Sequence, residues 1–119
     1  MWNEPSELEL RALPAIGTNE EVDWKEVLIR MHFFLGGCDW YVAEYAPADR
    51  IFYGYAILND DLDNAEWGYM SLDEMRDIRT RQGFEIDRDL HWQERKASEI
   101  EKIVAAYRGQ SSDRIKPKA

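Results

Sequence analysis

Residues 27–45 have the sequence VLIRMHFFLGGCDWYVAEY, and this stretch decides the fold. Apolar residues alternate from Val27 to Leu35, which is the period of a β-strand with one buried face. Gly36 and Gly37 then favour a tight turn. The aromatic and branched residues from Trp40 to Tyr45 predict a second strand. Because a short turn joins the two strands, we expect them to pair antiparallel.

Two more strands are expected after this hairpin, over residues 51–58 and 66–70. A turn at residues 46–49 and an acidic loop at residues 59–64 separate them from their neighbours. Gly54 inside the third strand predicts a β-bulge or an aromatic ring lying over the backbone. Four consecutive strands with short connections form an antiparallel meander.

Helices are expected outside the meander, because the form Ser-x-x-Glu is typical of a helix N-terminus. It occurs at Ser6, Ser71 and Ser98. The predicted helices span residues 7–12, 72–82 and 99–108. Gly83 and Gly109 are expected to end the second and third of them. Residues 84–92 alternate again and predict an edge strand. The fold class is therefore α+β: an antiparallel β-meander of about four strands with two to three helices packed against one face.

The chain has 119 residues and a mass of 14.0 kDa, which is the size of one domain. We expect a compact domain over residues 1–109 and a polar, basic tail over residues 110–119. The only cysteine, Cys38, excludes an intramolecular disulfide and is expected to be a passive thiol. The sequence has neither an apolar run long enough for a membrane span nor a signal peptide, so we expect a cytoplasmic protein without membrane contact.

Charge is distributed unevenly along the chain, whose formal net charge is −9. Residues 1–75 contain 16 acidic and four basic residues, a net charge of −12. Residues 76–119 contain eight acidic and 11 basic residues, a net charge of +3. The acidic part should repel nucleic-acid phosphate and attract a basic protein surface, or else simply keep the protein soluble.

Six segments, in their order and spacing, resemble a bacterial family of small proteins of unknown function. They are residues 9–14 (ELRALP), 31–34 (MHFF), 40–45 (WYVAEY), 51–55 (IFYGY), 67–75 (WGYMSLDEM) and 86–92 (IDRDLHW). This chain departs from the family at Cys38, where a second Trp often precedes the Trp-Tyr pair. Members of the family are often encoded on plasmids, integrative elements and phages. The resemblance implies a mobile-element context and no particular activity.

One segment gathers acid, base and imidazole. If residues 87–91 are extended, Asp87, Asp89 and His91 share one side of the strand. With Glu44 and His32 supplied from elsewhere, they could serve acid–base catalysis or hold a divalent cation. The alternative is structural: Arg88, on the other side of the strand, would form an ion pair with Glu44.

A second group suits a protein partner. The acidic loop supplies Asp60, Asp61, Asp63 and Glu66, and we expect exposed aromatic anchors at Trp40, Tyr53 and Trp67. The loop does not have the spacing of an EF-hand, so no metal or cofactor is expected. Aromatic rings could stack nucleic-acid bases, but Arg50 is the only basic residue in residues 40–70, so direct nucleic-acid binding is not expected.

These observations favour a non-enzymatic, acidic protein-interaction module. It would modulate a host nuclease, a defence complex or a replication protein, with acidic surface in place of phosphate. The alternative is a small metal-dependent or acid–base enzyme that uses Glu44, Asp87, Asp89 and His91. A structure separates the two, because these four side chains must converge in one pocket to form an active site.

Overall fold

A computed structural model describes residues 1–115, with side chains for residues 1–110. Its regular helices are α1 (Glu7–Arg11), α2 (Leu72–Asp77) and α3 (Glu101–Ile115). Its strands are β1 (Leu28–Ile29), β2 (Met31–Leu35), β3 (Cys38–Ala46), β4 (Ile51–Ile57), β5 (Glu66–Ser71), β6 (Asp87–Arg88) and β7 (Arg95–Lys96). Short 3₁₀ turns are η1 (Trp24–Glu26), η2 (Leu62–Asn64) and η3 (Ala97–Glu99). None of the described helices is long and apolar enough to cross a membrane.

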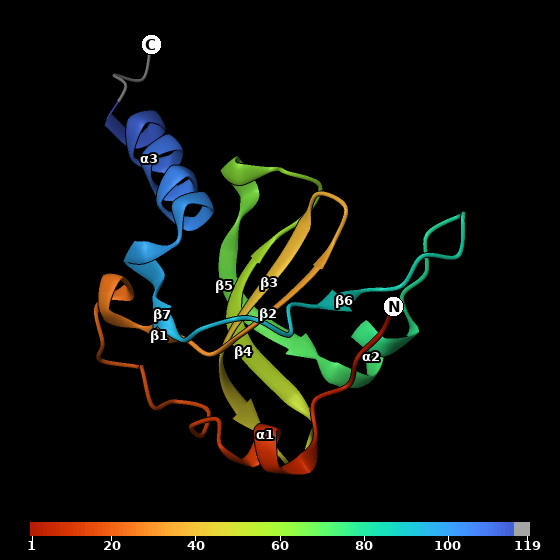
Figure 1. The fold of residues 1–119 in the computed structure, drawn as a ribbon. Coiled ribbons are helices and arrows are strands. Elements are labelled where there is room, and N and C mark those ends of the chain that lie inside the picture. The colour runs from red at the N-terminus through yellow and green to blue at the C-terminus, as the bar shows by residue number, and fades with distance from the viewer. Residues whose placement is uncertain (116–119) are drawn as a thin grey trace.

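The main sheet has five antiparallel strands in the order β5-β4-β3-β2-β6 (Figure 1). The α+β class and the four-strand meander are therefore confirmed. An edge strand does lie beside β2, but β6 covers only Asp87–Arg88 of the predicted residues 84–92. The strand expected over residues 27–35 is divided at Arg30. Its first part, β1, pairs with β7 in a small second sheet, and only β2 joins the main sheet.

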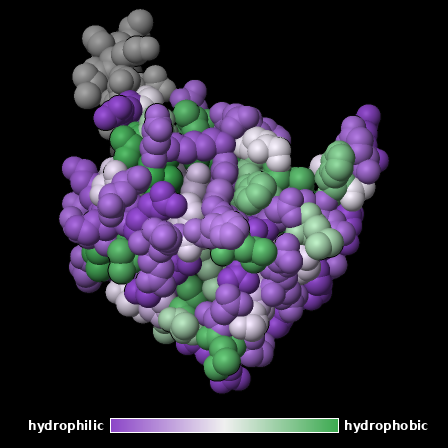
Figure 2. All heavy atoms as spheres, in the orientation of Figure 1, coloured by the Kyte–Doolittle hydropathy of each residue, from purple (hydrophilic) through white to green (hydrophobic). Residues whose placement is uncertain are grey.

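The sheet is covered on both faces, whereas helices were expected on one face only. Core one lies on the face that packs against α1 and α2, through residues such as Leu10, Phe33 and Leu72. Core two lies on the opposite face, where Ile103 of α3 packs against Tyr55. The central strand β3 is buried over most of its length because it contributes to both cores. Since most apolar side chains pack into the two cores, the surface is mainly hydrophilic with scattered apolar groups on the side of the molecule that Figure 2 shows.

A β-bulge interrupts β3 at Ala43, between Val42 and Glu44. Val42 pairs with Gly54 of β4, Glu44 pairs with Tyr53, and Ala43 is the additional residue. The sequence predicted a bulge or an overlying ring at Gly54 itself; the bulge lies instead in the neighbouring strand β3, next to Val42, which pairs with Gly54. Because the extra residue shifts the alternation by one, Glu44 points to the face of Tyr53 and core two, rather than to the face of Val42 and core one.

Two of the three predicted helix caps are confirmed. The Ser6 and Ser71 hydroxyls accept the backbone N–H groups of Glu9 and Glu74. Ser98 does not cap a helix, because its hydroxyl donates to the carbonyl of Lys25. Helix α3 begins at Glu101, not Glu99.

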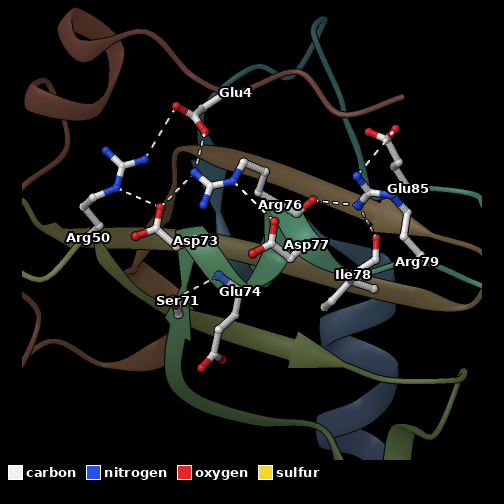
Figure 3. A network of polar contacts seen from close by, with 10 residues as sticks. All are labelled: Glu4, Arg50, Ser71, Asp73, Glu74, Arg76, Asp77, Ile78, Arg79 and Glu85. Atoms are coloured by element: carbon white, nitrogen blue, oxygen red, sulfur yellow. Dashed lines mark hydrogen bonds and ion pairs between the residues drawn. The ribbon is translucent and has the colours of Figure 1, made fainter.

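Two helix ends differ from the prediction. Helix α2 ends at Asp77, where the Arg79 guanidinium donates to the carbonyls of Arg76 and Ile78 (Figure 3). Helix α3 continues through Gly109 to Ile115. Residues 116–119 of the predicted tail lie outside the described residues, and the domain boundary at residue 109 stays a prediction.

Candidate functional site

The four residues of the enzyme hypothesis do not converge in one cavity: Glu44 lines one cavity and Asp89 another, and neither cavity is lined by Asp87 or His91. Asp87 forms an ion pair with the amino group of Met1. The Asp89 carboxylate accepts the N–H of His91 at 3.0 Å, and the His91 side chain is exposed. Glu44 lies on the core-two face, away from β6. Among the described residues, no group of three or more His, Cys, Asp and Glu side chains could hold a metal ion.

The predicted ion pair between Glu44 and Arg88 is not formed. Arg88 instead binds Glu9 of α1 through both carboxylate oxygens, with 3.2 Å between Nη1 and Oε1. The side-chain hydrogen bond from Arg88 and the backbone hydrogen bond from Ser6 together lower the pKa of Glu9 to about 2. The bulge at Ala43 explains the difference, because it turns Glu44 to the opposite face of the sheet from Arg88.

Glu44 is a buried carboxylate with hydrogen-bond partners but no cationic partner. Its side chain belongs to a residue only 2% exposed. Oε1 accepts the N–H of Gly17 at 2.8 Å, and Oε2 accepts the backbone N–H and the side-chain amide of Asn19 at 2.8 and 2.7 Å. No described lysine, arginine or histidine forms an ion pair with it. A buried carboxylate of this kind is unusual, because buried charges are normally paired.

This carboxylate lies in the wall of a cavity of about 470 Å³. Five aromatic side chains line the same cavity: Trp24 of η1, Tyr53 of β4, Trp67 and Tyr69 of β5, and Tyr107 of α3. The remaining lining residues are Ile16, Gly17, Asn19, Glu20, Val22 and Val27. The lining therefore contains two carboxylates and no basic residue.

The aromatic side chains that line the cavity contact one another. The Trp24 and Tyr107 rings stack with 3.7 Å between centroids, and Trp67 Nε1 donates to the Tyr107 hydroxyl at 2.7 Å. On the sheet side, Tyr53 lies 6.0 Å from Trp67 and 5.3 Å from Tyr69 between ring centroids. Burial raises the pKa of the Tyr53 hydroxyl, and the nearby charge of Glu44 raises it further. The Glu44 carboxylate therefore interacts electrostatically with Tyr53, an aromatic residue of the cavity wall.

The three aromatic residues predicted to bind a partner do not lie on one surface. Tyr53 and Trp67 line the cavity and are half-buried. Trp40 is 7% exposed and belongs to core one, so its expected exposure is wrong. The burial of Trp40 follows from alternation along β3, which places its side chain with that of Val42 on the face covered by α1 and α2.

The predicted acidic loop is partly neutralised within the molecule. Lys102 of α3 binds Asp60 at 2.8 Å and also binds Asp39. Asp61 caps η2 by accepting the N–H of Asn64. Asp63 and Glu66 are exposed. Asp61, Asp63 and Glu66 form no ion pair with a described residue, but the carboxylates that line the cavity beside the aromatic rings are those of Glu44 and Glu20.

A second polar cluster joins β2 to α3. Asp39 accepts a hydrogen bond from His32 at 2.8 Å as well as from Lys102. Burial by itself would raise the pKa of Asp39, but these two hydrogen bonds outweigh it and lower the pKa below its ordinary value. His32 stacks on Tyr41 with 4.6 Å between centroids, and its Nδ1 lies 3.8 Å from Asp89. The half-buried position expected for His32 is confirmed.

A smaller cavity of about 280 Å³ contains Arg88 and Asp89 and differs in its charge balance. Its two arginines are paired with its two glutamates, Arg88 with Glu9 and Arg30 with Glu94. Its charges are therefore largely compensated from within, and the larger cavity is the better candidate site.

Comparison with known families adds one finding. The model of a family described as a protein of unknown function, DUF2958, matches residues 7–109. The chain belongs to the DUF2958 family. The matched segment of the DUF2958 domain includes every residue that lines the large cavity. No curated protein and no solved structure matches the chain.

The sequence did not identify Trp24, Tyr69 or Tyr107 as parts of a site, nor Glu44 as the charge of a cavity wall. Tyr107 shared the apolar stripe of the last helix and was typical of a core residue. Trp24 lies in a segment predicted to be a polar loop, and the presence of a large aromatic residue there was the one sequence feature that could have indicated a site. The position of Glu44 depends on the bulge, which alternation alone could not place.

Proposed function

We propose that this DUF2958 protein is a non-enzymatic interaction module that binds a basic surface of another protein. The observation that carries the proposal is the large cavity, where aromatic surface adjoins two carboxylates without a cationic partner among the described residues. Tyr69 at its edge is 69% exposed. An exposed aromatic residue beside uncompensated charge suits a protein interface, since large aromatic residues dominate affinity and charge selects the partner.

The distribution of basic residues supports the same conclusion. On the opposite face, Arg50 and Arg76 both contact Asp73 at 3.0 Å and also contact Glu4 (Figure 3). Charges in that region are therefore compensated within the molecule. A basic partner gains most from carboxylates that have no such counter-charge, and Glu44 and Glu20 of the cavity are among them.

The enzyme hypothesis receives less support from the geometry. A general acid and base must both reach one reacting centre. Here Asp87 is paired with the Met1 amino group and Asp89 accepts the N–H of His91, whereas Glu44 lies on the other face of the sheet. We therefore prefer the interaction module to a metal-dependent or acid–base enzyme.

We propose further that the partner is a host nuclease, a defence complex or a replication protein. Two observations support this finer proposal: the resemblance to proteins encoded on mobile elements, and an acidic surface that can occupy a site built for phosphate. The protein would then act by contact, in the cytoplasm, without binding nucleic acid itself.

The test is capture of partners from host lysate, followed by measurement of association rates at several salt concentrations. Glu20→Gln/Glu21→Gln removes the charge of Glu20, which lines the cavity, and that of its exposed neighbour Glu21. The matched control, Asp49→Asn/Glu74→Gln, removes two exposed charges that form no ion pair with a described residue. We expect the first variant to associate several-fold more slowly at low salt, with a weaker salt dependence. Equal rates for both variants would contradict the proposal.

A second arm tests catalysis directly. Asp89→Asn and His91→Gln should leave partner binding and any biological effect unchanged. Loss of the effect in these variants, with binding and thermal unfolding unaltered, would indicate an enzyme instead.

A further inference from the structure

We infer that the large cavity is a binding site for a methylated ammonium group, and that its ligand is a methylated lysine side chain of the protein partner. The inference rests on the proposed function and adds the chemistry that the partner presents. It combines three features of the cavity: its buried charge, its aromatic walls and the hydrogen bonds that already occupy most acceptor positions of Glu44.

The buried charge favours a cation. Glu44 is fixed by three hydrogen bonds from Gly17 and Asn19, so its position does not depend on a ligand. Its carboxylate lines the cavity without a cation nearby, and Glu20 adds a second negative charge. Charge interactions are stronger in such a partly desolvated site than in water. A cation entering the cavity would supply the counter-charge that Glu44 lacks.

The walls favour a cation that is bulky and poorly hydrated. Tyr53, Trp67 and Tyr69 of the sheet line the same cavity as Trp24 of η1 and Tyr107 of α3. Aromatic faces attract cations through their quadrupole, and several rings around one space form the cage that recognises quaternary ammonium groups. A volume of about 470 Å³ is sufficient for such a group and its alkyl chain.

Hydrogen bonding distinguishes methylated ammonium from arginine or unmodified lysine. A carboxylate has about four acceptor positions, and Glu44 already uses three of them. At Glu44 itself, a guanidinium or a primary ammonium would find about one free acceptor position for its several N–H donors, at a cost in free energy. A trimethylated ammonium has no N–H donor and needs only charge and aromatic surface.

Four versions of one short peptide test this chemistry. Each is a Gly-rich pentapeptide whose central residue is trimethyl-lysine, lysine, arginine or the neutral carbon analogue of trimethyl-lysine, in which a tert-butyl group replaces the trimethylammonium. Binding is followed through the indole N–H signals of the protein in NMR. We expect trimethyl-lysine to shift the signals of Trp24 and Trp67. Trp2 and Trp40, which contact core one, should not shift.

The order of affinities is the main result. Trimethyl-lysine should bind roughly tenfold more tightly than its neutral analogue if charge and cation–π attraction both act. It should also bind more tightly than lysine and arginine. Equal binding of the charged and neutral peptides, or tighter binding of arginine, would overturn the inference. Choline is the fifth probe, and binding tighter than that of the peptide would assign the site to a free small molecule instead.

Two aromatic variants separate the site from the rest of the surface. Tyr69→Leu removes an exposed ring of the cavity and should weaken the trimethyl-lysine peptide roughly two- to fivefold. Phe84→Leu is the matched control, because Phe84 is 64% exposed and does not line the cavity. Glu44→Gln should abolish the preference for the charged peptide, and a thermal melt of this variant shows whether it folds. If it does not fold, Glu20→Gln provides the charge test at the mouth.

The inference and the proposed function can fail separately. If the captured partner depends on Glu20 and Tyr69 but no peptide shifts the Trp24 and Trp67 signals, the interaction module stands and the methyl-ammonium site is wrong. If trimethyl-lysine binds but partner capture ignores these residues, the site is real and the proposed role in capture is wrong.

Discussion

The Glu9 carboxylate makes folding stability depend on pH through its contacts with Arg88 and Ser6. Its pKa is about 2 in the folded protein and 4.5 ordinarily, so the folded state favours the ionised form. The stabilisation is therefore complete above pH 4.5 and is lost as the pH falls from 4.5 towards 2. In Arg88→Gln this part of the pH dependence should largely disappear. Urea unfolding of both proteins at several pH values in this range measures the difference.

Arg11→Gln is the matched control for Arg88→Gln, because Arg11 contacts Glu7 in an exposed ion pair. It should retain the steep loss of stability seen in the original protein. Parallel curves for all three proteins would show that Arg88 does not lower the pKa of Glu9.

Gly54 is required by close approach of the backbone. A Cβ atom there would lie 1.9 Å from the Tyr41 carbonyl oxygen, beside the bulge. Gly54→Ala should therefore destabilise the protein by about 3 kcal/mol, as measured by urea unfolding. Gly68 pairs with Gly54 across β4 and β5, but a Cβ atom at Gly68 would have no neighbouring atom within 4 Å. Gly68→Ala should be neutral or slightly stabilising, and equal losses in the two variants would refute the steric explanation.

At the scale of elements, Lys102 fixes α3 to the sheet. It binds the buried Asp39 and the exposed Asp60 from the first turns of the helix. Lys102→Met should destabilise the protein by about 1–3 kcal/mol, because the buried Asp39 would then lose its lysine partner. Urea unfolding and hydrogen exchange of the α3 amides measure the loss.

Lys96→Met is the control for this element, because Lys96 contacts Glu26 in an exposed pair. Its cost should stay below about 1 kcal/mol. If the two lysine variants have the same stability, the contact with Asp39 does not hold α3 in place.

Elements with strong local signals were predictable from the sequence. Alternation located β2 to β5, and Ser6 and Ser71 marked the starts of α1 and α2. What depended on distant contacts was not predictable. Arg30 divides the first strand because Ile29 packs in core two, whereas Met31 packs in core one. The same limit applies to the site, since its rings come from η1, the sheet and α3.

At the scale of the whole molecule, the two cores share β3 and should unfold together. Trp40 reports on core one and Trp67 on core two. Because both faces of one strand are buried, loss of either core exposes the strand that the other core needs. The indole signals of these two residues should therefore disappear at the same urea concentration. Separate midpoints would show that each face of the sheet folds on its own.

The bulge at Ala43 has a consequence for how members of the family should be compared. Side chains of β3 alternate between the two faces of the sheet, and one additional residue reverses this alternation for every residue after it. A relative that lacked this residue would turn the equivalent of Glu44 towards core one, and its cavity wall would keep only the carboxylate that corresponds to Glu20. The number of residues in this strand therefore decides whether the Glu44 carboxylate lines the cavity. Relatives are therefore best grouped by the number of residues between the Trp-Tyr pair and the following glutamate, before their cavities are compared.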